Sequence, residues 1–243
     1  MYFNGVDLHS VHHTLSINKE IPPGAAARNI TSIAGLDGDR FAGAAIQQDE
    51  YKVRVNIAGK SRREAWEVRA LLAAWAYSSD KPAELIPTHW PGVHYMAVCK
   101  EIEPPEFTFG FATVTVSFAL MRPIAVDNNI SRSVGSKSAS MPITGSAPAR
   151  PTITQQLDAS AADVTFSIDG KPFLHLAPKS TYNAGSLIVI DTEARTVTVN
   201  GTHRETDIDY TSSRWRPGFV KGSHTVASSA EGRIEIAWRN EWY

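Results

Sequence analysis

The sequence predicts a mainly β protein in two parts, an N-terminal α+β sandwich with one helix and a long arm, and a C-terminal all-β sandwich. Short runs of β-branched and apolar residues recur between turn residues through most of its 243 residues. One stretch, beginning after Ser61, instead repeats its apolar residues with a helical period. Composition changes between 122 and 151, and we place the two domains at 1–140 and 141–243.

The stretch 184–201 shows the β pattern of the second part most clearly. An apolar run at 187–190 and an alternating run at 196–199 flank a short polar break, and Asn200-Gly201 ends the pair. Two antiparallel strands and their turn have this pattern, because asparagine and glycine tolerate the positive φ of a reversing chain. None of these residues carries catalytic chemistry.

Composition narrows the class of protein. The formal net charge is −1, which creates no long-range field that would attract nucleic acid or an anionic membrane. A single cysteine, Cys99, rules out an internal disulfide, and its apolar neighbours favour a buried thiol over a nucleophile. The first residues lack a signal-peptide pattern, and no apolar run reaches membrane-spanning length. We therefore expect a soluble protein that folds in the cytoplasm.

The N-terminal part opens with a loose alternation over residues 1–20, which indicates a pair of strands at a sheet edge. The segment 21–50 follows, and it has few large apolar residues between its prolines and glycines. It is too long for an ordinary connection. Because such a segment gains order most easily on another subunit, we interpret 21–50 as an arm.

The predicted helix runs from Arg62 to about Tyr77. Ser61 and Glu64 have the spacing of a capping box, in which the serine hydroxyl accepts from the backbone N–H three residues on. At about 100° per residue, six apolar residues fall on one stripe and are expected in the core. They are Ala65, Val68, Leu71, Leu72, Trp75 and Ala76.

A second apolar side of this helix has two interpretations. Its members and their flanking cations are Trp66, Ala70, Ala73, Tyr77, Arg62 and Arg69. It could pack within its own domain, as helix flanks often do. It could instead meet a neighbouring subunit, because tryptophan, tyrosine and arginine are enriched in interfaces.

Further strands are expected on both sides of the composition change. In the first part they lie at 52–58, 84–86, 95–102 and 107–120, and in the second at 164–168, 173–176, 224–226 and 234–238. The region 122–151 is interpreted as a linker or a pair of weak strands.

No pattern of a catalytic, cofactor or metal site is visible in the sequence. His9, His12 and His13 are close enough to share a metal ion, but no carboxylate accompanies them, and a solvent-facing cluster is the expectation. Asp37-Gly38-Asp39 lacks the later ligands of a calcium loop and indicates a turn. Neither a phosphate loop nor a dinucleotide fingerprint is present. Four aspartates have the spacing of strand ends and are expected in solvated turns: Asp158, Asp163, Asp169 and Asp191.

Three residues of the second part raise a different possibility. If Trp215, His224 and Trp238 are exposed, their aromatic faces could stack on sugar rings and form a sugar-binding module. Large aromatic side chains are mostly buried, so the alternative is that these tryptophans fill the core of the sandwich.

Several short motifs also occur in a characteristic order. They are FNGVDL at 3–8, IAGLDG at 33–38, LLAAW at 71–75, YMAV at 95–98, TVTVSF at 113–118, the hairpin at 187–201, GSHTV at 222–226 and IEIAWR at 234–239. In this order they resemble the distal tail protein family of phages with long non-contractile tails, the siphophage tail components at the baseplate hub. Lys221 and His224 replace the proline and asparagine usual in that family, and Ala119 stands where it often has cysteine.

The resemblance implies a structural function, with a galectin-like C-terminal domain and neither catalysis nor a cofactor. It implies a homohexameric ring built from the first domain, with the arm around Leu36 wrapping the neighbouring subunit. The implied partners are the tail tube protein, a tail-associated lysin or fibre protein, and receptor-binding or baseplate proteins. The implied location is the tail tip of the virion, after assembly in the host cytoplasm. Candidate inter-subunit residues are Arg62, Trp66, Arg69, Tyr77 and Leu36.

Two other functions stay open at this point. One is a carbohydrate-binding β-sandwich module that acts at the host cell surface, and the other is a hydrolase with an unrecognised site. A ring predicts a closed oligomer, whereas a lone binding module predicts a monomer, so the mass in solution separates these hypotheses.

Overall fold

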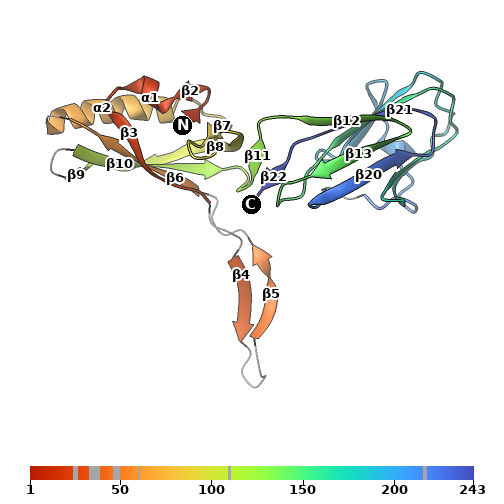
Figure 1. Ribbon diagram of the computed structural model, residues 1–243, viewed down its shortest axis with the longest axis horizontal. Helices are drawn as coiled ribbons and strands as arrows, with labels where there is room; N and C mark the ends of the chain where they lie inside the picture. The colour runs from red at the N-terminus through yellow and green to blue at the C-terminus, as the bar shows by residue number, and fades with distance from the viewer. Residues whose placement is uncertain (24–26, 33–38, 46–49, 60, 109–110, 216–217) are drawn as a thin grey trace. The chain divides into compact units, whose positions relative to one another are not determined.

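The computed structural model describes residues 1–23, 27–32, 39–45, 50–59, 61–108, 111–215 and 218–243, with the backbone alone for 27–32 and 39–45. The chain divides into two compact units (Figure 1), which are described separately below. Unit 1 comprises Met1–Val126 with Tyr243, and unit 2 comprises Asp127–Trp242. The predicted mainly β fold with one main helix is confirmed.

Unit 1 is built on one antiparallel sheet with the strand order β2-β1-β7-β8-β10-β6-β3. These strands are β1 (Tyr2–Phe3), β2 (Val6–Asp7), β3 (Leu15–Ile21), β6 (Glu50–Ile57), β7 (Ala83–Ile86), β8 (Val93–Ile102) and β10 (Phe111–Leu120). In addition, β9 (Glu106–Thr108) pairs with β10, and β11 (Ala125–Asp127) pairs with β8. Every strand expected in this part is present, the one at 107–120 as the pair β9 and β10.

The first twenty residues contain the expected strand pair and more. The hairpin β1–β2 lies at one edge of the sheet, as expected, and β3 lies at the opposite edge. Between them lies a short helix, α1 (Leu8–Val11), which the alternation did not predict. The Asp7 carboxylate begins this helix by accepting from the backbone N–H of His9 at 3.4 Å, which is a normal helix-capping contact.

The helix α2 (Arg62–Ala76) begins where its capping residue predicts. The Ser61 hydroxyl accepts from the Glu64 backbone N–H at 3.2 Å, and such a cap is worth about 1 kcal/mol. The helix covers one face of the sheet (Figure 1), and five residues of the expected stripe are buried: Ala65, Val68, Leu72, Trp75 and Ala76.

Leu71 was expected in the core but is 47% exposed. It lies at the border of the buried stripe, where the much larger Trp75 already fills the space. The Trp75 ring lies 5.9 Å from that of Phe3 and 6.1 Å from that of Phe118, and its indole N–H donates to the Val6 carbonyl at 3.0 Å. Trp75 therefore anchors the helix to both the sheet and the N-terminal hairpin.

The segment interpreted as a loop-like arm contains regular secondary structure. Strands β4 (Ala27–Ser32) and β5 (Asp39–Ala45) pair antiparallel as a separate two-stranded sheet, with a register shift between Arg28 and Ile30. Leu36 lies outside the described residues. The arm is therefore a β-hairpin in its backbone, although its apolar residues are too few for the sequence pattern to have indicated strands.

Unit 2 is a sandwich of two antiparallel sheets, as predicted. The six-stranded sheet has the order β12 (Ser131–Ser136), β21 (Gly232–Trp238), β14 (Thr152–Leu157), β17 (Leu187–Asp191), β18 (Thr196–Val199) and β19 (Thr202–His203). The four-stranded sheet has the order β13 (Ser138–Ile143), β20 (Gly222–Ser228), β15 (Val164–Ile168) and β16 (Lys171–Leu176). A 3-10 helix, η1 (Glu205–Asp207), and β22 (Glu241–Trp242) complete the unit.

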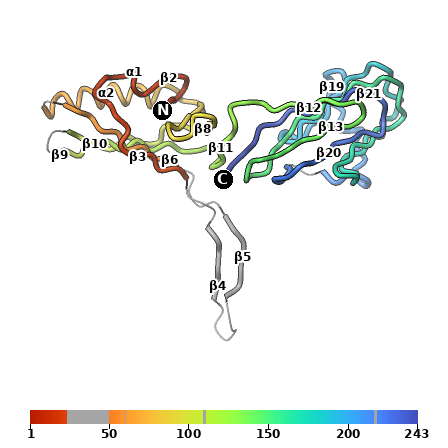
Figure 2. The backbone as a smooth tube through the Cα atoms, in the orientation of Figure 1, coloured from red at the N-terminus to blue at the C-terminus, as the bar shows by residue number. Residues whose placement is uncertain are grey.

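The region 122–151, interpreted as a linker or a pair of weak strands, contains the strands β12 and β13. Unit 2 therefore begins at Asp127 and not at the expected residue 141. The chain passes from β12 in one sheet directly into β13 in the other (Figure 2), with Lys137 at a φ of 67° between them. At Gly135 a Cβ atom would lie 1.8 Å from the Ser138 carbonyl oxygen, so only glycine fits this corner.

The predicted hairpin is formed by β17 and β18. Ile188 pairs with Val199 and Ile190 with Val197, and all four side chains are buried. They pack in the core between the two sheets with Phe166, Leu174 and other apolar side chains. In the described part of the chain, no helix is long and apolar enough to cross a membrane.

Candidate assembly interface

The outer face of α2, formed by Trp66, Ala70, Ala73, Ala74 and Tyr77, is the main candidate for contact with another protein. Trp66 is 48% exposed and Tyr77 is 54% exposed, and the alanines between them are exposed or half-buried. The opposite side of the same helix fills the core of unit 1. The sequence left two interpretations of this second apolar side, and the structure excludes burial of Trp66 and Tyr77 within unit 1.

Trp66 is held in a defined position by Arg69. The guanidinium of Arg69 donates to the Ile102 carbonyl at 2.8 Å and to the Glu103 carbonyl at 3.1 Å. Its central carbon lies 5.4 Å from the Trp66 ring centroid, within the range of a cation–π contact. Because Arg69 is fixed to the end of β8, the indole is presented with little freedom, which lowers the entropy cost of binding a partner.

Tyr77 marks the C-terminal end of the outer face. Its backbone N–H donates to the Ala73 carbonyl at 2.9 Å, so its position is set by the last turn of the helix. Partial burial, together with a hydrogen bond to the Cys99 thiol, raises the pKa of the Tyr77 hydroxyl. Burial likewise raises the pKa of Cys99, which is 6% exposed, so the thiol stays protonated as the sequence predicted for a structural cysteine.

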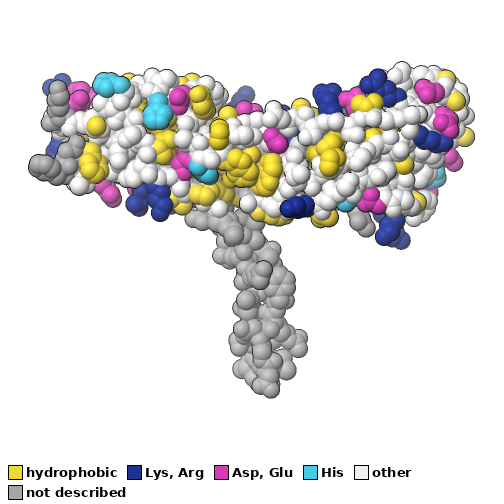
Figure 3. Space-filling model, in the orientation of Figure 1, with side chains coloured by type: hydrophobic (Ala, Val, Ile, Leu, Met, Phe, Trp, Pro, Cys, Tyr) yellow, Lys and Arg dark blue, Asp and Glu magenta, His cyan; other side chains and the backbone are white. Residues whose placement is uncertain are grey.

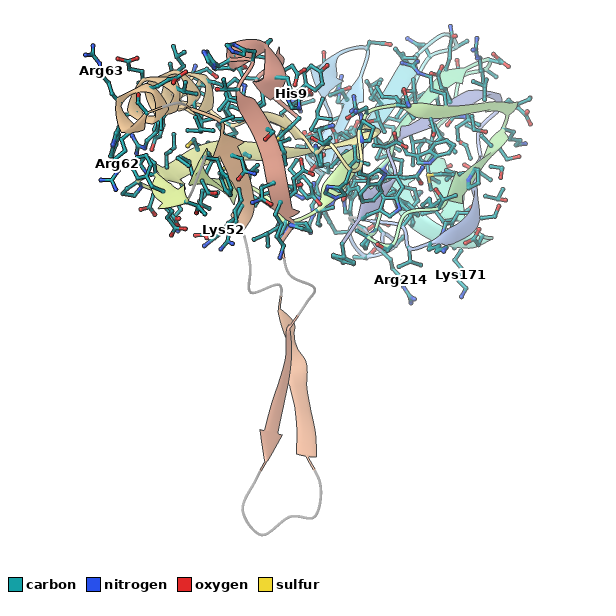
Figure 4. All side chains as sticks on the ribbon, turned by 60° about the vertical axis from the view of Figure 1, so that its left-hand side comes forward. His9, Lys52, Arg62, Arg63, Lys171 and Arg214 are labelled. Carbon is teal, nitrogen blue, oxygen red and sulfur yellow. The ribbon has the colours of Figure 1, made fainter. Side chains whose placement is uncertain are left out.

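The N-terminal end of α2 carries two arginines with different surroundings (Figure 4). The Arg62 guanidinium lies 5.2 Å from the ring centroid of Phe107 on β9, at a cleft of about 330 Å³ between the helix and the β9–β10 strands. Arg63 points away from the sheet and pairs with Glu67 at 2.9 Å. That exposed pair contributes only a few tenths of a kcal/mol to the helix, about 0.3–0.5.

Four of the five predicted inter-subunit residues therefore lie on α2. Arg62, Trp66, Arg69 and Tyr77 are all on the side of the helix that faces away from the core, and the fifth, Leu36, lies outside the described residues. The sequence missed Phe107 and Phe111, which are 40% and 38% exposed next to Arg62. Strand alternation gave no signal for them, because it does not show which strand face a helix covers.

The residues proposed to stack on sugars are placed differently. Trp238 is 4% exposed in the core of unit 2, as the alternative interpretation held. Trp215 is partly buried, with its ring 6.4 Å from that of Phe173. His224 is half-buried, and its Nδ1 pairs with the Asp169 carboxylate at 2.8 Å. These three side chains do not form an exposed aromatic platform.

The histidine cluster and the aspartates singled out in the sequence lie in turns or contact neighbouring side chains. The rings of His12 and His13 lie 4.4 Å apart, and no group of metal-ligating side chains occurs among the residues that the structure describes. Asp191 accepts from the backbone N–H groups of Glu193 and Ala194 at 2.9 Å each, which is the turn role predicted for it. Charges of both signs are interspersed over the visible surface of each unit (Figure 3).

Comparison with known proteins identifies both parts of the chain. Residues 7–120 match the RIFT-related domain of phage tail proteins, and residues 144–242 match the C-terminal domain of siphovirus-type tail components. The chain is therefore a phage tail component. No curated protein matches the sequence.

Solved structures extend the match to the whole fold. The Dit protein of phage SPP1, described as a paradigm of hub adsorption apparatus in phages that infect Gram-positive bacteria, is 14% identical with a TM-score of 0.78. The alignment covers 99% of this chain and 98% of that one. The baseplate of phage P2 in its activated conformation with Ca is 11% identical, covering 93% and 90% of the two chains with a TM-score of 0.47. The two family models together match most of the chain in this order, so the chain belongs to the distal tail protein family of siphovirus-type tail components, and the SPP1 protein shares its fold.

Proposed function

We propose that this chain assembles as a ring of six copies at the tip of a long non-contractile tail, where it joins other tail proteins. One side of the ring binds the tail tube protein, the other binds a tail-associated lysin or fibre protein, and the galectin-like second unit carries receptor-binding or baseplate proteins. The protein is assembled in the host cytoplasm and acts in the virion. Its function is structural and not enzymatic.

The outer face of α2 is the observation that carries this proposal. A capped helix of 15 residues presents an apolar surface whose largest member, Trp66, is fixed by Arg69. Exposed tryptophan in a rigid setting is the residue type that most often dominates binding energy in protein interfaces. The resemblance of the sequence motifs to the distal tail protein family supports the number of six copies and the choice of partners.

A heterologous contact also fits this surface better than a two-fold dimer. The outer face carries the apolar stripe and is flanked by the cations Arg62 and Arg69. The exposed carboxylates Glu84, Glu101 and Glu106 lie on the strands, and the exposed Glu67 of α2 is paired with Arg63. In a head-to-tail ring the helix of one subunit meets a different surface of the next, so the charges can be complementary.

Measurement of mass in solution tests the proposal. Purified full-length chain should sediment at six times its 26.5 kDa mass over a wide concentration range, and electron microscopy of the same sample should show closed rings. A monomer at high micromolar concentration would contradict self-assembly, and turnover of a substrate would contradict the structural function.

A further inference from the structure

A polar cleft of about 460 Å³ lies in unit 2. The connection from β16 to β17 forms one wall, and the chain from Val199 through Asp207 forms the other. Backbone hydrogen bonds fix both walls. Tyr182 exchanges two bonds of 2.9 Å with Ala161, and the Ala177 N–H donates to the Asp207 carbonyl at 2.7 Å.

A buried polar pair forms the floor of this cleft. Tyr182 is 6% exposed and Asp207 is 7% exposed, and the Tyr182 hydroxyl donates to the Asp207 carboxylate at 2.9 Å. Burial, followed by the bond to Asp207, raises the pKa of Tyr182, so the phenol stays protonated and the carboxylate keeps its donor. Since the Tyr182 ring is covered, it offers no open face on which a sugar ring could stack.

The rim of the cleft supplies two cations and several neutral polar groups. Lys179 and Arg204 are exposed, and neither side chain forms an ion pair or hydrogen bond with another residue that the structure describes. The neutral lining residues are Ser180, Thr181, Asn183, Ser186, Asn200 and Thr206. The one carboxylate that lines the cleft, Asp207, is already bonded to Tyr182.

We propose that this cleft binds a phosphorylated polyol or sugar. Arginine and lysine recognise phosphate through charge-assisted hydrogen bonds, and Lys179 and Arg204 are both available for them. Hydroxyl and amide side chains can donate to and accept from the hydroxyls of a polyol. A site for a neutral sugar would instead present an exposed aromatic face. This site is independent of ring assembly, because it uses only residues of unit 2.

Saturation-transfer NMR on the full-length chain tests the site with glycerol 3-phosphate as the probe. Glycerol lacks the charge and inorganic phosphate lacks the carbon chain, so both should bind at least tenfold more weakly than the probe. The double variant Lys179→Gln/Arg204→Gln should lower the affinity at least tenfold, since a bond to a charged group is worth about 1.5–3 kcal/mol. Thr206→Val removes one hydroxyl and should lower the affinity severalfold.

Arg233→Gln provides the matched control, because Arg233 is exposed on β21 and does not line the cleft. It should leave the affinity within twofold of the parent. A glycerol-phosphate polymer that binds better than the monomer would identify an extended ligand, whereas a polymer that is excluded would identify a small soluble one. The proposal is wrong if the probe gives no transfer, if phosphate alone binds equally well, or if Arg233→Gln and the double variant lose affinity equally.

Discussion

Substitution of Trp66 can distinguish a contribution to the stability of the subunit from a contribution to assembly of the ring. Its side chain is 48% exposed in unit 1, so Trp66→Ala removes little buried surface from the folded subunit. In a ring, the same change should weaken each subunit contact by about 2 kcal/mol or more, as truncation of a central aromatic anchor does. Sedimentation over a dilution series measures the loss of assembly, and chemical denaturation measures the stability of the subunit.

Tyr210→Ala is the control for this experiment, because Tyr210 is 71% exposed and belongs to unit 2, whereas α2 belongs to unit 1. It should change neither quantity. An equal loss of subunit stability and assembly in Trp66→Ala would show that the indole contributes mainly to the core. Arg69→Lys should give a weaker form of the Trp66→Ala result, since lysine cannot reach two carbonyls and the indole at once.

His224 makes the stability of unit 2 depend on pH. Its Nδ1 contacts the Asp169 carboxylate at 2.8 Å and its Nε2 contacts the Val220 carbonyl at 2.9 Å. Both partners are acceptors, so the ring donates to both only when it is protonated. Burial alone would lower the pKa of His224, but the bonds to Asp169 and Val220 raise it overall, while the bond from His224 lowers the pKa of Asp169.

The signs of these shifts give the direction of the pH effect. A raised histidine pKa stabilises the fold fully below the unfolded value of 6.5, and this stabilisation is lost as pH rises through the folded value. Because the pKa of Asp169 is lowered in the folded protein, its carboxylate stabilises the fold above the unfolded pKa of 3.8, and this stabilisation is lost only in stronger acid. The difference in unfolding free energy between the parent and His224→Gln should therefore be larger at about pH 5.5 than at about pH 8.5.

Denaturant titrations at both pH values, followed by tryptophan fluorescence, measure this difference. His203→Gln is the control, because the His203–Glu205 pair is exposed at 71% and 34% of its side chains and such pairs contribute little. A pH-independent difference for His224→Gln would show that folding does not raise the pKa of this ring.

At the scale of secondary structure, the two strands that flank the arm, β3 and β6, pair with each other. The last residue of β3, Ile21, pairs directly with Lys52 on β6, and the Tyr51 hydroxyl donates to the Glu20 carboxylate at 3.2 Å. Glu20 also accepts from the backbone N–H of Thr88 at 2.9 Å and pairs with the His89 ring. The two strands are thus joined by contacts of their own.

This arrangement allows a precise deletion. Replacing residues 22–49 with a short Asn-Gly linker should leave unit 1 folded, because β6 from Glu50 onward is kept and the linker joins two strands that already pair. If the arm wraps a neighbouring subunit, the shortened chain should fail to form rings while its circular dichroism and unfolding midpoint remain close to those of the parent. Rings of unchanged mass would refute the role of the arm.

The sequence predicted elements whose pattern is local and missed those that depend on distant contacts. Ser61 and Glu64 located the start of α2, and the alternation at 187–199 gave the hairpin. The region around Gly135 was interpreted as a linker or a pair of weak strands, because β12 and β13 acquire partners only from β21 and β20, about a hundred residues later in the chain. Small and polar residues there carry no periodic signal of burial.

The same limit applies to the candidate interface. Helical periodicity predicted the side of α2 that the sheet covers, but not whether its second apolar side is covered as well. The covered side is anchored by Trp75, whose ring contacts Phe3 and Phe118, residues far from it in the sequence. Arg69 was predicted as an inter-subunit residue from its residue type alone. Its hydrogen bonds to the Ile102 and Glu103 carbonyls join residues more than thirty positions apart, and no sequence pattern indicates them.

At the scale of the whole molecule, the proposed ring should be insensitive to salt. The outer face of α2 is apolar at its centre and the chain carries a net charge of only −1, so contacts between subunits should depend on burial more than on charge. Between about 0.1 M and about 1 M salt the screening length falls from about 10 Å to about 3 Å. An interface held by exposed ion pairs would dissociate over this range.

We expect the sedimenting mass to stay at six subunits at both salt concentrations, because screening acts on charges and leaves the hydrophobic contribution in place. The Trp66→Ala variant separates the two contributions. With the apolar anchor removed, the remaining contacts of Arg62 and Arg69 should make the assembly salt-dependent, and its mass should fall as salt is added. A parent ring that dissociates in high salt as readily as the variant would show that charged contacts, and not the tryptophan face, hold the subunits together.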